Sequence, residues 1–173
     1  MAHATRFARL TSPNHCAHPT PPLAQSGVRG VVTLKQAKTG GAVTLKLRVT
    51  GVSPNSVHGF HVHALGNLSN GCVSAGGHFN PTNAPHGGPL DPEGKRHAGD
   101  LGNVTADAEG VIDATITDAH ISLIGDRSVV GRALVLHADA DDLGRGGFPD
   151  SITTGHAGAR IACGVVGVDA DSE

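Results

Sequence analysis

The chain has 173 residues, a formal net charge of −2 at pH 7, and many Gly (25) and Pro (10) residues but no Trp or Tyr. This length is enough for one domain with a real core, which must be built mainly from Val, Ile, Leu and Ala. The charge balance points to neither nucleic acid nor a membrane surface as a partner, and no apolar run is long enough for a transmembrane helix.

Residues 1–26 differ in composition from the rest of the chain. They contain no acidic residue, include Arg6, Arg9 and several Ser and Thr, and carry the Pro-rich stretch HPTPPL (18–23). This composition is typical of a loosely ordered N-terminal extension or of an organellar transit peptide, and it lacks the apolar core of a secretory signal. We therefore expect a cytoplasmic protein, or a chloroplast or mitochondrial one if 1–26 is a transit segment.

Short β-rich segments follow from residue 27 almost to the end of the chain. The clearest is 42–49, where Val and Leu alternate with Thr, Lys and Arg in the period-two pattern of a half-exposed strand. Many short strands between Gly-rich turns, without helical periodicity, indicate an all-β antiparallel sandwich or barrel. We predict strands at 27–34, 42–49, 57–63, 101–106, 110–118, 128–138 and 159–168.

Two long segments interrupt the strands. Residues 64–99 are rich in Gly, Asn and Pro, and residues 139–158 are rich in Gly and Asp. A long loop inside a compact domain is usually either functional or disordered. Bound metal and a disulfide could order the first of these loops.

The sequence HGFHVH (58–63) places two histidines, His61 and His63, on one face of a predicted strand, because side chains two residues apart point the same way. Two imidazoles on a rigid strand face suit copper or zinc. His58 should face the opposite side, so we expect it to make a structural hydrogen bond. Further histidines occur in GCVSAGGHFNP (71–81), HGGP (86–89), RHAGDLGN (96–103) and LHADADDLG (136–144).

With ARIACGVVGV (159–168), these segments give the chain a specific resemblance to the copper/zinc superoxide dismutases over about residues 27–168. The resemblance implies a Greek-key antiparallel β-barrel or sandwich with two long functional loops. Residues 64–99 would be its metal-binding loop and 139–158 its channel loop, within a dismutase-like domain at 27–170. The resemblance also implies copper and zinc as cofactors, a homodimer, and a possible copper chaperone that loads the metal.

The resemblance further implies two metal sites that share a ligand. Because only six histidines match seven nitrogen positions, one imidazole must bridge both metals, and His78 takes that place. Three nitrogens and one oxygen suit a closed structural zinc site, whereas a catalytic copper needs a face open to substrate. The expected copper ligands are His61, His63, His78 and His137, and the expected zinc ligands are His78, His86, His97 and Asp100.

Other residues receive roles from the resemblance alone. Arg160 matches the arginine that orients the incoming anion, and His78 would also supply a proton to peroxide. Asp141 matches the acid that hydrogen-bonds one ligand of each metal, and Thr154 matches the threonine that narrows the channel.

Three cysteines are present, and an odd number cannot be fully paired within one chain. Cys72 and Cys163 match the cysteines of the family's intrasubunit disulfide. Cys16, in the N-terminal segment, is then the unpaired one.

The activity implied is dismutation of superoxide, 2 O₂⁻ + 2 H⁺ → O₂ + H₂O₂, by a redox-cycling copper bridged to a structural zinc, in antioxidant defence. The alternative is a dismutase-like copper chaperone, or a metal-binding domain without turnover. Such domains usually lose a copper ligand, whereas all four copper positions here are histidine.

The sequence departs from the family in two places that matter for the fold and the rate. Prolines just before Gly27 exclude a central strand there, so the first family strand is either formed by 4–10, with a long insertion after it, or absent. The channel loop has Arg145 as its only basic residue before Arg160, so we expect weak electrostatic steering of the anion.

Overall fold

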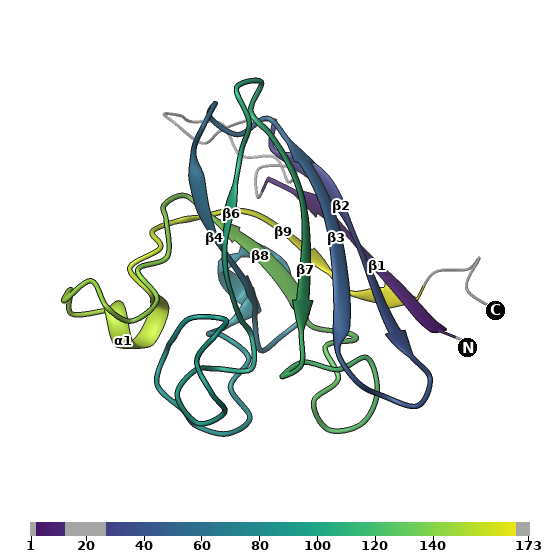
Figure 1. Cartoon of the computed structure of the whole chain (residues 1–173). Coiled ribbons are helices and arrows are strands. Elements are labelled where there is room, and N and C mark those ends of the chain that lie inside the picture. The colour runs from purple at the N-terminus through teal and green to yellow at the C-terminus, as the bar shows by residue number, and fades with distance from the viewer. Residues whose placement is uncertain (1–2, 13–26, 169–173) are drawn as a thin grey trace.

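Nearly all regular structure in the computed structural model, which describes residues 3–12 and 27–168, consists of antiparallel strands (Figure 1). Two short helices occur within the described ranges, the 3₁₀ helix η2 at Val73–Ala75 and α1 at Ser151–Thr154. The strands are β1 His3–Thr11, β2 Arg29–Ala37, β3 Val43–Thr50, β4 Val57–Val62, β5 Ser69–Cys72, β6 Asp100–Thr105, β7 Val111–Asp118, β8 Ala133–His137, β9 Arg160–Val165 and β10 Gly167–Val168.

The hydrogen-bonded order of the main strands is β6-β4-β8-β9-β1-β2-β3-β7, with β10 paired to β1. The two outermost strands of this order, β6 and β7, are consecutive in the chain and contact each other, so the sheet nearly closes into a barrel. The chain crosses from β3 to β4 and from β7 to β8, between strands that are not neighbours. These crossings are the Greek-key arrangement, and they confirm the predicted all-β fold class.

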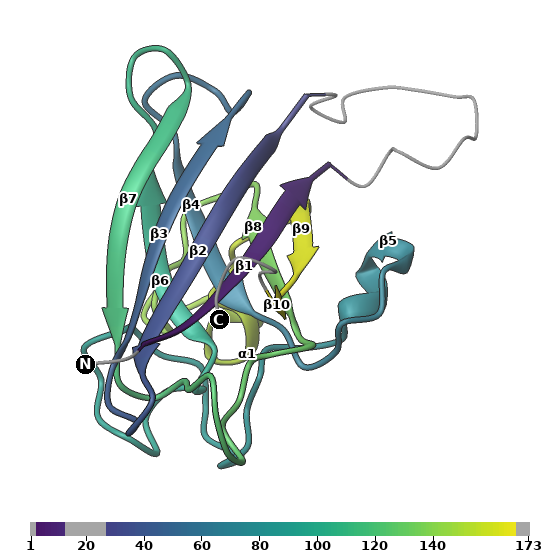
Figure 2. The ribbon, with the colours of Figure 1, turned by 90° about the vertical axis from the view of Figure 1, so that its right-hand side faces the viewer.

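Strand β1 resolves the two alternatives for the start of the barrel. It pairs with β2 from His3–Ala37 to Thr11–Arg29 and also contacts β9, as Figure 2 shows. Residues 3–11 therefore belong to the barrel, which corrects the expectation that all of 1–26 is a loosely attached extension. Inward-facing Ala8 and Leu10, both fully buried, are the physical reason. Residues 13–26, including Cys16, lie outside the described part.

The barrel core consists of aliphatic side chains from the inward faces of the strands. In β3, Val43, Leu45, Leu47 and Val49 are buried while Lys46 and Arg48 are exposed, as the period-two pattern predicts. Among the described residues, no helix is long and apolar enough to cross a membrane.

Several predicted boundaries differ from the structure; β2, for example, ends at Ala37 instead of residue 34. Strand β8 begins at Ala133 instead of residue 128, because Val129–Arg132 forms a turn in which Gly131 has a φ of +81°. Val129 is fully buried, so its apolar character reflects core packing rather than strand structure. The loop at 64–99 also contains β5 and η2, which stand away from the barrel in Figure 2.

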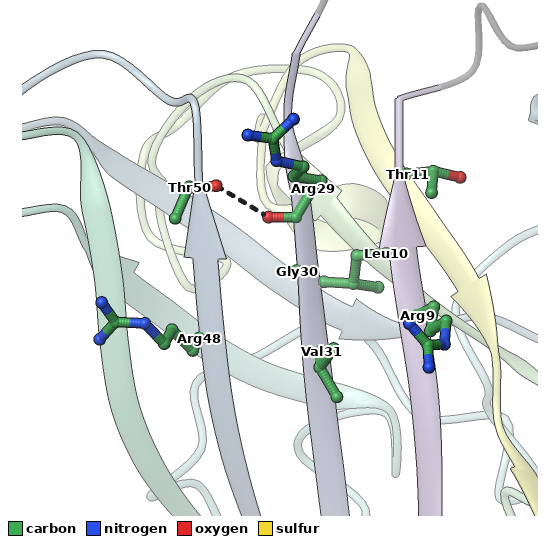
Figure 3. Close-up of a pocket in the computed structure, with 8 residues that line it drawn as sticks. All are labelled: Arg9, Leu10, Thr11, Arg29, Gly30, Val31, Arg48 and Thr50. Atoms are coloured by element: carbon green, nitrogen blue, oxygen red, sulfur yellow. Dashed lines mark hydrogen bonds between the residues drawn. The ribbon is translucent and has the colours of Figure 1, made fainter.

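The outer face of β1, β2 and β3 is basic. Arg9, Val31 and Arg48 are cross-strand neighbours there, and a surface pocket of about 360 Å³ lies beside them (Figure 3). Its lining contains no predicted site residue. The exposed cations of this face are Arg9, Arg29, Lys35, Lys46 and Arg48.

Candidate metal centre

Four histidines converge beside strands β4 and β8. His61 lies in β4 and His137 ends β8, while His63 follows β4 and forms an isolated bridge with His78 of the metal-binding loop. One ring nitrogen from each lies within 4.8 Å of the others, and we call these four side chains the first group. The structure thus brings together all four of the predicted copper ligands.

Hydrogen bonds at the outer nitrogens fix which nitrogen of each ring points inward. His63 Nδ1 donates to Gly76 O (2.8 Å) and His137 Nδ1 donates to Gly158 O (3.2 Å), so each Nε2 keeps a lone pair. These two Nε2 atoms are only 3.3 Å apart. Two acceptors facing each other in a buried site need a cation between them.

His61 and His78 complete this arrangement. His61 Nε2 donates to Asp141 Oδ2 at 2.7 Å, because a carboxylate can only accept. His61 Nδ1 and His78 Nε2 are buried and have no hydrogen-bond partner among the described residues. Orphaned buried nitrogens are costly unless a metal ion takes their lone pairs, so the first group fits one.

The second group shares His78 with the first and gathers around Asp100 at the start of β6. Asp100 Oδ1 lies 2.9 Å from His78 Nδ1, 3.0 Å from His86 Nδ1 and 3.1 Å from His97 Nδ1. His78 and His97 present their Nδ1 atoms to each other at 3.4 Å. Four donors around a zinc-sized ion in tetrahedral geometry are separated by about 3.3 Å, so this spacing also fits a metal ion.

Asp141 of the channel loop joins the two groups. Its Oδ2 accepts from His61 and its Oδ1 accepts from His86 Nε2 at 2.8 Å. Asn103 holds the backbone of Asp141 through two hydrogen bonds, of 2.7 and 2.8 Å. His61, His86 and Asp141 also lie close enough to hold an ion themselves, but both carboxylate oxygens are already used by the two imidazoles.

Burial keeps the imidazoles of the first group neutral. It lowers the pKa of His61 to about 3, and the nearby His78 adds to this shift. It likewise lowers the pKa of His63 to about 2 and that of His137 to about 4. Neutral imidazole is the form that binds metal, so the first group is ready to do so at neutral pH.

The second group behaves differently because it contains a carboxylate. Burial lowers the pKa of His86, but the adjacent Asp100 and Asp141 outweigh it and raise the pKa to about 9. Burial also opposes ionisation of Asp100, yet the three imidazoles around it hold its pKa well below the usual range. A metal ion bound here would replace the proton of His86.

Arg160 and the disulfide hold the adjoining part of the metal-binding loop. Cys72 and Cys163 form the predicted disulfide, which joins β5 to β9. Arg160 Nη1 donates to Cys72 O at 2.7 Å, and its Nη2 donates to Gly76 O at 2.6 Å. Gly76 O therefore accepts from both Arg160 and His63, and the guanidinium lies next to the first group.

Thr154 is the predicted site residue that the structure keeps apart from the two groups. It is exposed on α1, and its hydroxyl donates to the backbone and carboxylate oxygens of Asp150. His58 is buried between Ser56 Oγ (2.6 Å) and His137 O (2.8 Å), in the structural role expected for it.

Two residues that shape the site had no predicted role. Asn103 clamps Asp141, and its place in the motif HAGDLGN was the available signal. Gly155, at the end of α1, packs directly on the Asp141–His86 contact, since an added Cβ would lie 1.9 Å from Asp141 Oδ1.

Comparison with known proteins decides the family. The family description "Copper/zinc superoxide dismutase (SODC)" matches residues 28–166. The chain belongs to the copper/zinc superoxide dismutase family. It is 52% identical over 143 residues to a Superoxide dismutase [Cu-Zn] of Candida glabrata, covering 83% of this chain and 92% of that protein.

A second relative from the copper/zinc superoxide dismutase family gives the same result. The Superoxide dismutase [Cu-Zn] of Yarrowia lipolytica is 52% identical over 145 residues, which is 84% of this chain and 93% of that protein. All seven residues of the two groups lie inside the family match, whereas β1 precedes it. The start of the barrel, at β1, therefore lies outside the family match.

Proposed function

We propose that this protein is a superoxide dismutase of antioxidant defence, converting two superoxide anions and two protons into dioxygen and hydrogen peroxide. The observation that carries the proposal is the convergence of four imidazoles whose inward nitrogens have lone pairs and no protein donor. Family membership supports the same activity.

Copper is proposed at the first group, because four imidazole nitrogens suit it, and zinc at the second group, because three nitrogens and a carboxylate suit zinc. Copper held there supplies the one-electron chemistry by cycling between Cu(II) and Cu(I). Asp141 orients one imidazole of each group and fixes its protonated nitrogen.

His78 and Arg160 are the residues to which we assign direct roles in turnover. The ring of His78 is held at Nδ1 by Asp100, while Nε2 is buried and unpaired. Nε2 is thus the atom at which a proton can be taken up and delivered to the product. The Arg160 guanidinium, half-buried beside the first group, supplies positive charge and hydrogen-bond donors to orient the anion. Thr154 remains proposed as a channel residue on the resemblance alone.

The assembly and location of the protein are proposed from the family as well. We propose a homodimer that a copper chaperone loads, without nucleic-acid or membrane partners. For location, we propose the cytoplasm over an organelle, because cleavage after residue 26 would remove β1, which pairs with β2 along its whole length.

Superoxide decay tests the proposed activity. The protein loaded with copper and zinc is compared with His61→Ala, which removes one inward nitrogen of the first group, and with His120→Ala as a control outside both groups. Decay should be fast with the unmodified protein and the control, and near the uncatalysed rate with His61→Ala. Equal rates for all three would overturn the enzyme assignment and leave the alternative, a metal-binding domain without turnover.

A further inference from the structure

The two long loops also meet outside the metal groups, where Arg145 of the channel loop contacts Asp91 of the metal-binding loop. Arg145 Nη2 donates to Asp91 Oδ1 at 2.6 Å. Apart from His86–Asp141, this is the one ion pair between 64–99 and 139–158 within the described ranges. A hydrogen bond from the Gly88 N–H, and then this contact with Arg145, hold the pKa of the Asp91 carboxyl below its usual value.

The other oxygen of Asp91 closes a turn that begins just after His86. Asp91 Oδ2 accepts from Gly88 N at 2.7 Å, and Gly88 O accepts from Asp91 N at 3.0 Å. The preceding residue, Gly87, donates its N–H to Asp100 Oδ2 at 3.1 Å. Asp91 therefore fixes a turn at 88–91. This turn directly follows His86, a member of the second group, and Gly87, which bonds the carboxylate of that group.

The channel loop packs on this turn at very short range. A Cβ at Gly144 would lie 2.7 Å from His86 O, and a Cβ at Gly88 would lie 3.2 Å from Arg145 Nη1. Leu143 Cβ is 3.4 Å from the same position on Gly88. Surfaces in such close contact move together, so the ion pair restrains the backbone of His86 against the channel loop.

We infer that Asp91 and Arg145 are positioning residues for the second group. Their ion pair keeps the turn at 88–91, and with it the adjoining residues 86 and 87, seated on the channel loop, so that His86 and Asp100 stay in place and the metal ion is retained. Both partners reach the surface, and the side chain of Arg145 is 59% exposed. The rate at which the metal ion is lost should therefore depend on ionic strength. The inference rests on the metal binding of the proposed function.

The rate of zinc release to a chromophoric chelator tests this role in the protein loaded with copper and zinc. The variant is Arg145→Gln, and the matched control is Arg127→Gln, which breaks an exposed pair with Glu93 on the same metal-binding loop. Arg127 lies between β7 and β8, away from both metal groups. Arg145→Lys keeps the charge and serves as the conservative variant.

At low salt, Arg145→Gln should release zinc about three- to tenfold faster, as expected when a pair worth about 1 kcal/mol is lost. Arg127→Gln should stay within about twofold, and Arg145→Lys should recover most of the effect. At about 1 M salt the difference between Arg145→Gln and the unmodified protein should nearly vanish. The d–d absorption spectrum of Co(II) bound at the second group should broaden in Arg145→Gln alone.

Two results would overturn the inference. Equal release rates for Arg145→Gln and the unmodified protein at low salt would show that the pair does not retain the ion. Equal acceleration by Arg127→Gln would show a general effect of loop charge. If the unmodified protein bound no zinc at all, the metal binding of the proposed function would itself be wrong, and that failure is separate from the other two.

Discussion

The histidines of the first group differ in which ring nitrogen they turn inward. His61 offers Nδ1, because its Nε2 is held by Asp141, whereas His63 and His137 offer Nε2, because backbone carbonyls hold their Nδ1 atoms. The sequence can name these residues through its motifs. The sequence could not predict which ring nitrogen of each histidine points inward. The carbonyl partners, at Gly76 and Gly158, lie in loops whose path depends on the folded barrel.

Replacing Asp141 should weaken both groups together. In Asp141→Asn the side chain offers one acceptor oxygen in place of two, so His61 or His86 loses its orienting partner. Loss of such a partner typically costs 10- to 100-fold in metal affinity, so we expect about that decrease for both copper and zinc. Competition titration with chelators measures it. Asp139→Asn, an exposed neighbour, is the control and should bind both metals normally.

The metal-free protein should lose stability as the pH falls from about 6.5 towards 4. The pKa values of His61 and His63 are lowered to about 3 and about 2, so the unfolded chain binds more protons than the folded one across this range. Each group lowers the free energy of unfolding by up to about 1.4 kcal/mol per pH unit. His86, with its pKa raised to about 9, acts oppositely and makes stability fall above neutrality.

Urea unfolding of the metal-free protein at a series of pH values measures this dependence. The free energy of unfolding should be greatest near pH 6.5, where the two opposing effects meet. A constant value between about pH 7 and pH 5 would show that these imidazoles are not neutral in the folded state.

Among the elements, strands with clear alternation were predictable and irregular segments were not. Strand β3 agrees within a residue with its predicted range, because its pattern records one buried face. The sequence alone does not decide whether β1 forms, because its partners are distant in the chain. An insertion separates it from β2, and most of the chain separates it from β9. Strand β5 has no alternation in SNGC, and it is tied to β9 by the disulfide.

The end of α1 makes a prediction at the scale of one element. Gly155 has a φ of +70°, and an added Cβ would lie 1.9 Å from Asp141 Oδ1 and 2.5 Å from His86 Nε2. Gly155→Ala should therefore displace the contact that joins the two groups and reduce zinc affinity at least about tenfold.

Gly147→Ala is the matched control for this substitution. Gly147 has a φ of +77° and nothing within 4 Å of an added Cβ, so it has the same backbone strain without the collision. Both variants should lose about 1 kcal/mol of unfolding free energy, but the control should bind zinc normally. Equal zinc affinity in the two variants would show that α1 does not support the site.

For the whole molecule, the distribution of charge predicts how the rate depends on salt. Arg145, the only basic residue of the channel loop, is engaged by Asp91, and four aspartates surround it in the same loop. Little positive charge is therefore free to attract superoxide from a distance. The catalytic rate constant should change little between about 10 and 200 mM salt, and a steep fall would show strong steering.

The basic face of β1–β3 has a consequence for how the molecule orients itself. The described carboxylates all lie between residues 91 and 150, on β6, β7 or the loops, whereas the cations of that face stand on β1, β2 and β3, where Arg48 pairs with Asp113 of the adjacent β7 (Figure 1). The molecule therefore carries a permanent electric dipole that its net charge of −2 conceals. At neutral pH and low salt it should be retained on a cation exchanger, with β1–β3 against the matrix and α1 turned towards the solution.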